Sequence, residues 1–484
     1  MYPFKVKPLV KIVGLLLMIE ALFMLTALPF SFYYERTDAM PIIYSAAITA
    51  AVGLILWFSR RNYEEREIGM REGYLIVLTV WIIISVFGAL PYYISGAIPH
   101  YTDAFFETMS GFSTTGASIL RDIEIIPKGL LFWRAMTHWL GGMGIIVLTI
   151  AILPFLGFGG MSLFFAEVPG IEKEKLSPRI KNTARSLWGI YAGLTFAMVI
   201  MLMLGGMNFF ESICHAFAAL ATGGFSPKNT SLAGYSPYIQ YVSILFMFLA
   251  GTNFTLHYLA INGKIKKAIS GVEYRTYVLI ILISSILITI GLIAQRHYGI
   301  EEAWRSALFN VVSIISCTGF ANEDYMLWPV YAWFILFMLM FIGGMAGSTS
   351  GSIKVIRWVV LLKNLRVSLR HLVHPSGVFR VRVDGRALNS MNMHNVLAIF
   401  YLYLLTFFIG TLILTITGLD LISSMGSVAT CMGGIGPGLN TTGPVANYAH
   451  LTDVAKWTLS FLMLLGRLEL FSVFVTWSRA FWKN

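Results

Sequence analysis

The sequence predicts an all-α polytopic membrane protein, in which an extra N-terminal helix pair precedes four related units around a common axis. Of its 484 residues, 57% are hydrophobic and only 12% are charged, whereas about a quarter of a soluble domain is charged. Apolar runs of about 20 residues, enough to cross a hydrocarbon core of about 30 Å, recur throughout. Between them a short, less apolar segment ending in small residues recurs four times.

The apolar runs predict the membrane spans directly. The first run follows Lys5, Lys7 and Lys11, but it exceeds the ~7–15 residues of a signal-peptide core, so we expect a retained helix. The expected spans are residues 9–32, 42–58, 74–94, 130–156, 187–207, 238–261, 274–293, 398–419 and 457–477.

The formal net charge of +11 does not indicate a nucleic-acid partner. When the chain is threaded through these spans from an inside N-terminus, most Lys and Arg residues fall on one side. That bias is the positive-inside rule, and it needs only the lipid bilayer as partner. It predicts a multi-pass protein with both termini in the cytoplasm.

Four segments of about 10–14 residues, too short to span, each end in a tetrad with glycine third. Repetition with matching long helices on either side indicates one unit copied four times. The tetrads are Thr114-Thr115-Gly116-Ala117, Ala221-Thr222-Gly223-Gly224, Cys317-Thr318-Gly319-Phe320 and Cys431-Met432-Gly433-Gly434. The units are residues 73–166, 167–263, 264–392 and 393–484, after a helix pair in residues 1–72.

A carboxylate stands near the start of each short segment, where it stabilises a helix N-terminus by ~0.3–1 kcal/mol. The C-termini, each carrying about −0.5 charge, would then face the tetrads. Non-helical backbone at membrane depth is tolerated only where it lines a cavity or is buried. These observations predict four pseudo-symmetric helix–pore loop–helix repeats around one central pore, with main-chain oxygens facing a cation. The carboxylates are Asp103, Glu211, Glu301 with Glu302, and Asp420.

Glycines in the long helices that follow the tetrads have a simpler interpretation, because small residues let helices pack closely. Packing explains these glycines, but it does not explain the tetrads, which end short segments and mostly carry threonine. The helix glycines explained in this way are Gly141, Gly142, Gly144 and Gly251, while Gly343-Gly344 and Gly466 stand at the corresponding steps of the third and fourth units.

The second long helix of the third unit is interrupted at residues 343–352, a run of Gly, Ser and Thr with one large side chain. Each glycine costs ~1 kcal/mol in a helix relative to alanine, so we expect an irregular intramembrane loop beneath the tetrads. Such a loop would plug or constrict the pore; a short re-entry with a packing role is the alternative.

Arg467 lies within the last apolar run, where a charge costs at least ~2.5–3.5 kcal/mol. It is expected to face the pore, to repel cations, and to donate to carbonyls of the interrupted segment. A pair with Glu469 is disfavoured, because residues two apart do not share a helix face. Glu20 is a second intramembrane charge, expected to serve packing or a partner contact.

In these features the whole chain resembles the Trk/Ktr/HKT superfamily of K⁺ transporters, and within it the bacterial Trk-H-type subunit. The resemblance lies in the extra helix pair, the interrupted helix, Arg467, and the tetrads within STTGAS, ATGGFSP, CTGF and CMGGIGPG. It implies K⁺ uptake across the bacterial inner membrane through a channel-like pore, with K⁺ as substrate and no organic cofactor in this chain.

The resemblance also implies a K⁺ filter, formed by Thr114, Thr115, Gly116, Ala221, Thr222, Gly223, Cys317, Thr318, Gly319, Cys431, Met432 and Gly433. The gate it implies comprises residues 343–352, chiefly Gly347, Ser348, Thr349, Ser350 and Gly351, with Arg467. Relatives that admit Na⁺ carry serine where this chain has Gly116, so K⁺ selectivity is implied. The loops lack the second glycine and the tyrosine of TVGYG, which predicts weaker selectivity. A homodimer and a cytoplasmic nucleotide-binding ring are the implied partners.

Two other function classes fit less well. A transporter coupled to H⁺ or Na⁺ needs titratable groups along its path, and mid-span candidates are few. An enzyme needs a catalytic constellation, and no histidine in a matching context accompanies the Gly-Ser-Thr-Ser-Gly stretch at residues 347–351. The cysteines Cys214, Cys317 and Cys431 have no metal-site or disulfide spacing.

Overall fold

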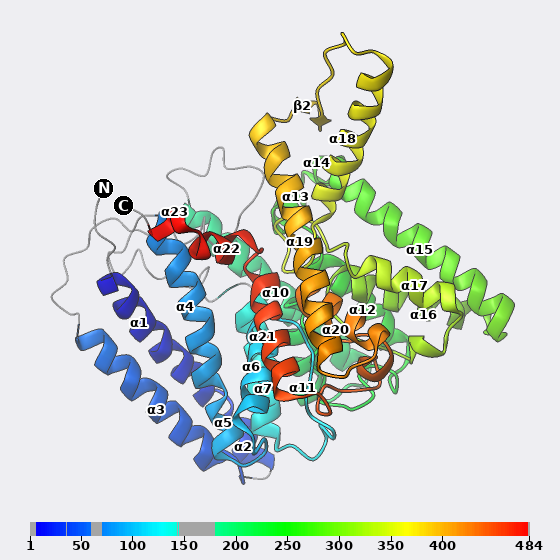
Figure 1. Cartoon of the computed structure of the whole chain (residues 1–484). Coiled ribbons are helices and arrows are strands. Elements are labelled where there is room, and N and C mark those ends of the chain that lie inside the picture. The colour runs from blue at the N-terminus through cyan, green and yellow to red at the C-terminus, as the bar shows by residue number, and fades with distance from the viewer. Residues whose placement is uncertain (1–5, 35, 60–69, 143, 145–179, 483–484) are drawn as a thin grey trace.

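A computed structural model describes residues 6–34, 36–59, 70–142, 144 and 180–482, and it is helical almost throughout (Figure 1). The all-α prediction is therefore confirmed. The helices are α1 (Val6–Leu25), α2 (Leu28–Tyr34), α3 (Ala39–Phe58), α4 (Met70–Gly88), α5 (Leu90–Ile94), α6 (Tyr101–Phe112), α7 (Lys128–Gly142), α10 (Ile180–Leu204), α11 (Phe209–Leu220), α12 (Pro237–Ala250), α13 (Phe254–Ile261), α14 (Ile265–Ile269), α15 (Val272–Arg296), α16 (Ile300–Ile315), α17 (Val330–Leu339), α18 (Val355–Val373), α19 (Ser390–Ile416), α20 (Leu421–Gly433), α21 (Asp453–Arg467), α22 (Phe471–Trp477) and α23 (Arg479–Trp482). Two 3₁₀ turns (Tyr325–Leu327 and Asn440–Thr442) and two short strands, β1 (Arg382–Val383) and β2 (Arg386–Ala387), complete the described elements.

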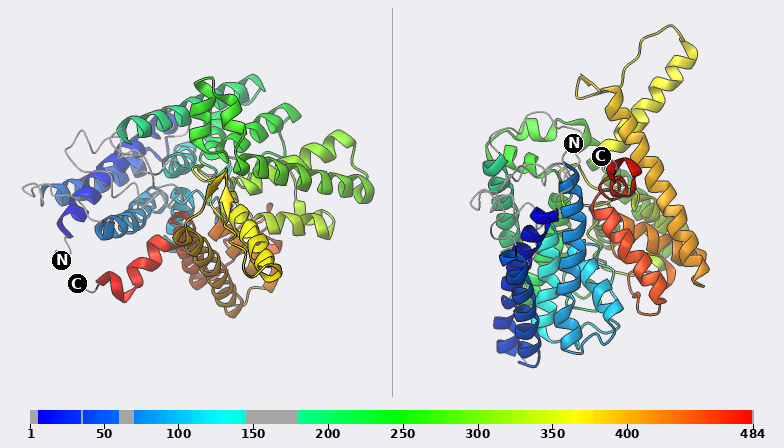
Figure 2. Two further views of the ribbon diagram at one scale, coloured as in Figure 1. Left: turned by 90° about the horizontal axis from the view of Figure 1, so that it is seen from above. Right: turned by 60° about the vertical axis from the view of Figure 1, so that its left-hand side comes forward.

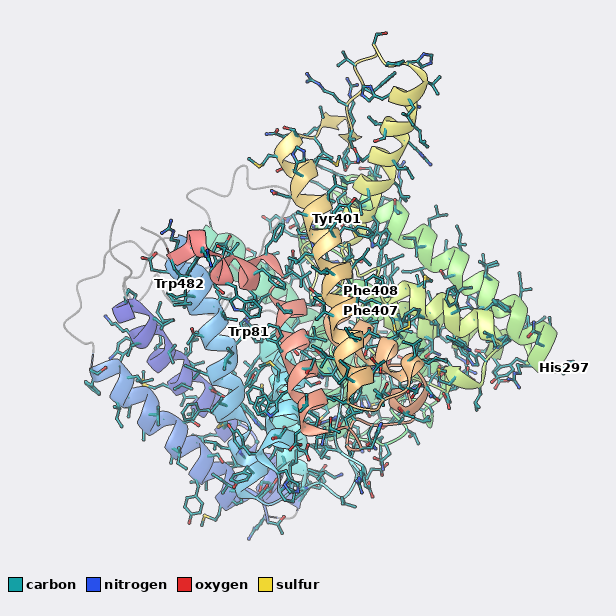
Figure 3. The ribbon with its side chains drawn as sticks, in the orientation of Figure 1. Trp81, His297, Tyr401, Phe407, Phe408 and Trp482 are labelled. Carbon is teal, nitrogen blue, oxygen red and sulfur yellow. The ribbon has the colours of Figure 1, made fainter. Side chains whose placement is uncertain are left out.

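Six helical segments of the described residues are long and apolar enough to cross a membrane. They coincide with the expected spans 9–32, 42–58, 74–94, 187–207, 274–293 and 398–419, which are thereby confirmed. Tyr401 and Phe408, labelled on α19 in Figure 3, are 66% and 63% exposed, as expected for a surface that faces lipid.

Two expected spans are wrong in one respect, because each is two helices joined at a sharp bend. α12 and α13 meet at 102°, and α21 and α22 meet at 111°. At the first bend Gly251 ends α12, and the Asn253 side chain accepts from Thr255 N at 2.8 Å to begin α13. At the second, Glu469 and Leu470 both have positive φ, of 53° and 48°. The span expected over residues 130–156 contains α7; most of its remainder lies outside the described residues.

The extra helix pair, α1 and α3, packs at one side of the molecule (Figure 1). Gly14 and Gly53 face each other where the helices cross, and a methyl group on either would overlap the other's carbonyl oxygen. Small residues allow this close approach in a membrane. Glu20 of α1 is buried at 1% exposure against Gly88, where α4 ends.

Seen from above, the chain runs around the molecule in sequence order, from cyan through green and yellow to red (Figure 2). The short helices α6, α11, α16 and α20 each lie between two other helical segments of their repeat. The basic α18 and the β1–β2 hairpin project from the end at which α22 and α23 also lie (Figure 1).

Candidate functional site

The four short helices begin as the sequence predicted, at carboxylates. Asp103 lies in the first turn of α6, Glu211 in that of α11, and Glu301 with Glu302 in that of α16. Asp420 caps α20 by accepting from Ser423 N at 3.0 Å. Asp103 also pairs with Lys456 of α21 at 2.6 Å, which ties the first repeat to the fourth.

The four short helices also end alike. The second residue after α6, α11 and α16, and the first after α20, adopts a left-handed backbone conformation. The N–H of the next residue then donates to the carbonyl five residues back, as in a Schellman motif. These bonds are Thr115 to Ser110 (2.9 Å), Gly223 to Ala218 (2.8 Å), Thr318 to Ser313 (2.8 Å) and Ile435 to Thr430 (2.9 Å).

This shared geometry corrects the register that the sequence predicted for two loops. The equivalent turns are residues 114–116, 222–224, 317–319 and 434–436, each with positive φ at its first and third residues. In the second loop the assigned residues therefore shift by one, from 221–223 to 222–224, and Ala221 is the C-cap of α11. In the fourth loop they shift by three, from 431–433 to 434–436, because Cys431, Met432 and Gly433 are the last residues of α20. We call these four segments the filter turns, after the role that the sequence predicts for them.

The filter turns meet in a closed ring. A methyl group on Gly116 would overlap the carbonyl oxygen of Gly223, and one on Gly224 would overlap that of Thr318. One on Gly319 would overlap the carbonyl of Ile435, and one on Gly436 would come within 2.7 Å of the carbonyl oxygen of Thr115. Glycine is required here both for its positive φ and for the close approach of main chains.

The interrupted segment is irregular, as the sequence predicted. No helix is assigned between Met340 and Lys354, and Gly347 and Ser352 have positive φ. Met345 N donates to Gly251 O at 2.9 Å, and Thr349 Oγ1 donates to Leu220 O at 3.1 Å. A methyl group on Gly351 would overlap the carbonyl of Gly433. The segment therefore contacts the ends of α11, α12 and α20, next to the filter turns.

Arg467 joins this segment to the first repeat. Its guanidinium donates to Thr349 O at 3.0 Å, to Gly142 O at 2.9 Å and to Gly141 O. It lies 3.4 Å from Thr114 Oγ1. The expected donation to a carbonyl of the interrupted segment is therefore present. Its guanidinium carbon is 5.7 Å from the ring centre of Trp81, which Figure 3 labels on α4.

A carboxylate that was not named from the sequence contacts the interrupted segment. Glu273, at the start of α15, accepts from Ala346 N at 2.7 Å and from Ile356 N at 3.3 Å. One side chain thus binds both the segment and the first turn of α18. Glu469 forms a salt bridge with Arg357 of α18. Glu273 lies 73 residues before Ala346 in the chain, so nothing in the sequence shows which backbone it reaches.

The segment between α6 and α7 carries a charge at the surface. Asn229 Nδ2 donates to Asp122 Oδ1 at 2.8 Å, and this hydrogen bond, with others from the backbone, lowers the pKa of the Asp122 carboxyl. The group is therefore ionised at neutral pH.

A sequence model of the TrkH family, described as a cation transport protein, matches residues 39–483. The chain belongs to the TrkH family. It is 37% identical to the Trk system potassium uptake protein TrkH of Vibrio parahaemolyticus over 487 residues, with 99% of each chain covered. It is 36% identical to TrkH of Escherichia coli K12 with the same coverage, and 32% identical to TrkG of that strain with 97% of each covered.

The fold matches a solved member of the TrkH family. The crystal structure of the potassium transporter TrkH from Vibrio parahaemolyticus aligns with a TM-score of 0.89 at 35% identity, covering 99% of this chain and 100% of that one. The chain is thus a multi-pass membrane protein of a transporter family.

Proposed function

We propose that this TrkH-family chain takes up K⁺ through a pore whose filter is the ring of filter turns. The observation that carries the proposal is the ring itself, in which each of four glycine-bearing turns has a main-chain carbonyl next to a glycine of its neighbour. Rings of carbonyls replace the hydration shell of K⁺ in selective pores. The potassium uptake named for the relatives supports the choice of ion.

The helix ends favour a cation at this centre. Each of α6, α11, α16 and α20 ends at a filter turn, so its partial charge of about −0.5 lies beside the proposed ion path. K⁺ is substrate here, and this chain needs no organic cofactor for the proposal. We assign the filter to residues 114–116, 222–224, 317–319 and 434–436.

We further propose that residues 343–352 and Arg467 form the gate. Thr349 and Met345 contact the second repeat, and Gly351 contacts the fourth, so the segment lies against both. The charge of Arg467 opposes the approach of a cation, while its bond to Thr349 O favours the position of the segment seen here. Opening would require both Arg467 and the segment of residues 343–352 to move.

A regulatory partner would act on this gate through α18. That helix continues directly from the interrupted segment and carries Arg357, which pairs with Glu469 beyond Arg467. We propose that its basic projecting end faces the cytoplasm and contacts a nucleotide-binding ring, that the chain acts as a homodimer, and that it lies in a bacterial inner membrane with both termini cytoplasmic. The excess of positive charge in this segment supports that orientation.

The filter assignment is tested by Gly116→Ser in purified protein reconstituted in lipid. The serine Cβ would displace the Gly223 carbonyl, and strain of about 1–3 kcal/mol would widen the ring. We expect the permeability ratio of K⁺ to Na⁺ to fall by about tenfold. Glycine-to-serine substitution at Gly234, where only Thr230 lies within 4 Å, is the matched control. An unchanged ratio in Gly116→Ser would argue against the filter.

A further inference from the structure

A buried polar side chain recurs at one position of all four short helices, seven residues before the left-handed residue of the filter turn. Each lies at 1% exposure or less. Each is hydrogen-bonded to the segment that follows the same filter turn. The pairs are Glu107 with Ser118 (3.0 Å), His215 with Ser226 (3.0 Å), Asn310 with Asn322 (2.7 Å), and Ser427 with Thr442 (2.9 Å). We call these four contacts the braces.

These four buried polar side chains are explained by the hydrogen bonds they make. A buried polar group without a partner costs about 1–3 kcal/mol, so each is costly unless its bond is made. The chemistry differs between repeats, from carboxylate to imidazole, amide and hydroxyl, while the connection stays the same. That pattern fits a requirement to fix the main chain behind each filter turn.

The first brace is the strongest, because it is ionic. Glu107 accepts from Ile119 N at 2.9 Å as well as from Ser118 Oγ, and it pairs with Arg134 of α7 at 2.7 Å. Both charged side chains are at most 3% exposed. Charge-assisted bonds are roughly twice as strong as neutral ones, so the segment after Gly116 is held tightly.

Arg134 carries this brace to the second repeat. Its NH1 donates to Ser226 O at 3.0 Å, and its guanidinium carbon lies 3.5 Å from the ring centre of Phe225. Ser226 is itself the partner of the second brace. The ion pair therefore sets the spacing between the first and second filter turns, where Gly116 meets the carbonyl of Gly223.

We propose that Glu107, held by Arg134, is a specificity-determining positioning residue of the filter. It touches no ion and acts through the positions of the main-chain carbonyls around Gly116. Discrimination between cations depends on the size and flexibility of such a ring, so loosening one turn lowers selectivity more than conduction. This inference rests on the proposed K⁺ conduction.

Two variants test it by reversal potentials of the purified full chain in lipid under K⁺ and Na⁺ gradients. Ser118→Ala removes one bond to Glu107 and leaves no charge unpaired. Glu107→Leu combined with Arg134→Met removes the brace, and apolar replacement of a whole buried ion pair is often tolerated. We expect the permeability ratio of K⁺ to Na⁺ to fall by about threefold in the first variant and about tenfold in the second, with K⁺ current retained.

Glu124→Gln is the matched control, because it removes a carboxylate that is 43% exposed and pairs with Lys228 at the surface. Its ratio should equal that of the parent chain. If both brace variants, purified as homogeneous protein, keep the permeability ratio of K⁺ to Na⁺ of the parent chain, the inference is overturned. The proposed K⁺ conduction would still stand. If the double variant does not fold, Ser118→Ala decides alone. A parent chain with no K⁺ preference would instead overturn the proposed function, and this inference with it.

Discussion

Gly436 and Gly433 distinguish the two registers of the fourth filter turn at the scale of single residues. Gly436 has a φ of 95°, and a methyl group there would come within 2.7 Å of the Gly116 carbonyl carbon. At Gly433, the last residue of α20, the nearest atoms to an added methyl are 3.0 Å away and belong to side chains. The two registers therefore predict opposite outcomes for glycine-to-alanine substitution at Gly436 and at Gly433.

We expect Gly436→Ala to abolish selective K⁺ flux, because strain of about 1–3 kcal/mol adds to a main-chain overlap. Gly433→Ala, its matched control, should retain most of the flux. K⁺ uptake into liposomes containing each purified variant is the measurement. The reverse result, with Gly433→Ala inactive and Gly436→Ala active, would favour the register predicted from the sequence.

The tetrads could be found from sequence, yet their register could not. Glycine was aligned with glycine, whereas the structurally equivalent first residues are Thr114, Thr222, Cys317 and Gly434. Threonine and cysteine disfavour the left-handed region, so their presence there gives no local signal. The partners of Glu107 and Arg467 were also out of reach: Arg134 lies 27 residues from Glu107, and Thr114 lies 353 from Arg467.

In the proposed gate the interrupted segment has to move, and Glu273 holds it through a hydrogen bond to Ala346 N. Glu273→Ala would remove two hydrogen bonds that the carboxyl group accepts, each worth about 0.5–1.5 kcal/mol. We expect the segment to move more easily and K⁺ flux through the isolated protein to rise several-fold. Glu273→Gln keeps an oxygen that can accept, so its flux should stay near that of the parent. Equal flux in all three proteins would show that Glu273 does not restrain the gate.

The charge of Arg467 is expected to act on the proposed gate independently of Glu273. A unit charge about 8 Å from a passing ion, at an effective dielectric constant of about 20, raises its energy by about 2 kcal/mol. Arg467→Ala should therefore increase K⁺ flux through the isolated chain by about tenfold or more. Arg479→Ala removes the same charge from an exposed position and should change nothing. Flux below that of the parent in Arg467→Ala would contradict a gating role.

Elements were predicted from sequence unevenly. The interruption at residues 343–352 was visible because glycine and hydroxyl residues are dense there. The bends at Gly251 and after Arg467 were missed because the apolar runs on either side of each bend are together long enough for one span. Asn253, which caps α13, was the available local signal at the first bend.

At the scale of the whole molecule, composition and repetition were enough to predict a helical membrane protein, and the match to the solved TrkH fold agrees. The ring that the four filter turns form together cannot be predicted from any single repeat. Each contributes one glycine and one carbonyl to a neighbour in the ring. The proposed selectivity would therefore be a property of the assembled chain, and it has to be measured on the intact protein.

The most direct test is the reversal potential of the purified chain in a lipid bilayer under separate K⁺, Na⁺ and H⁺ gradients. If the ring conducts K⁺, the reversal potential should shift by close to 59 mV for each tenfold change in the K⁺ gradient. It should respond weakly to Na⁺ and not to H⁺. A reversal potential that follows the proton gradient, or one that responds equally to K⁺ and Na⁺, would contradict the account.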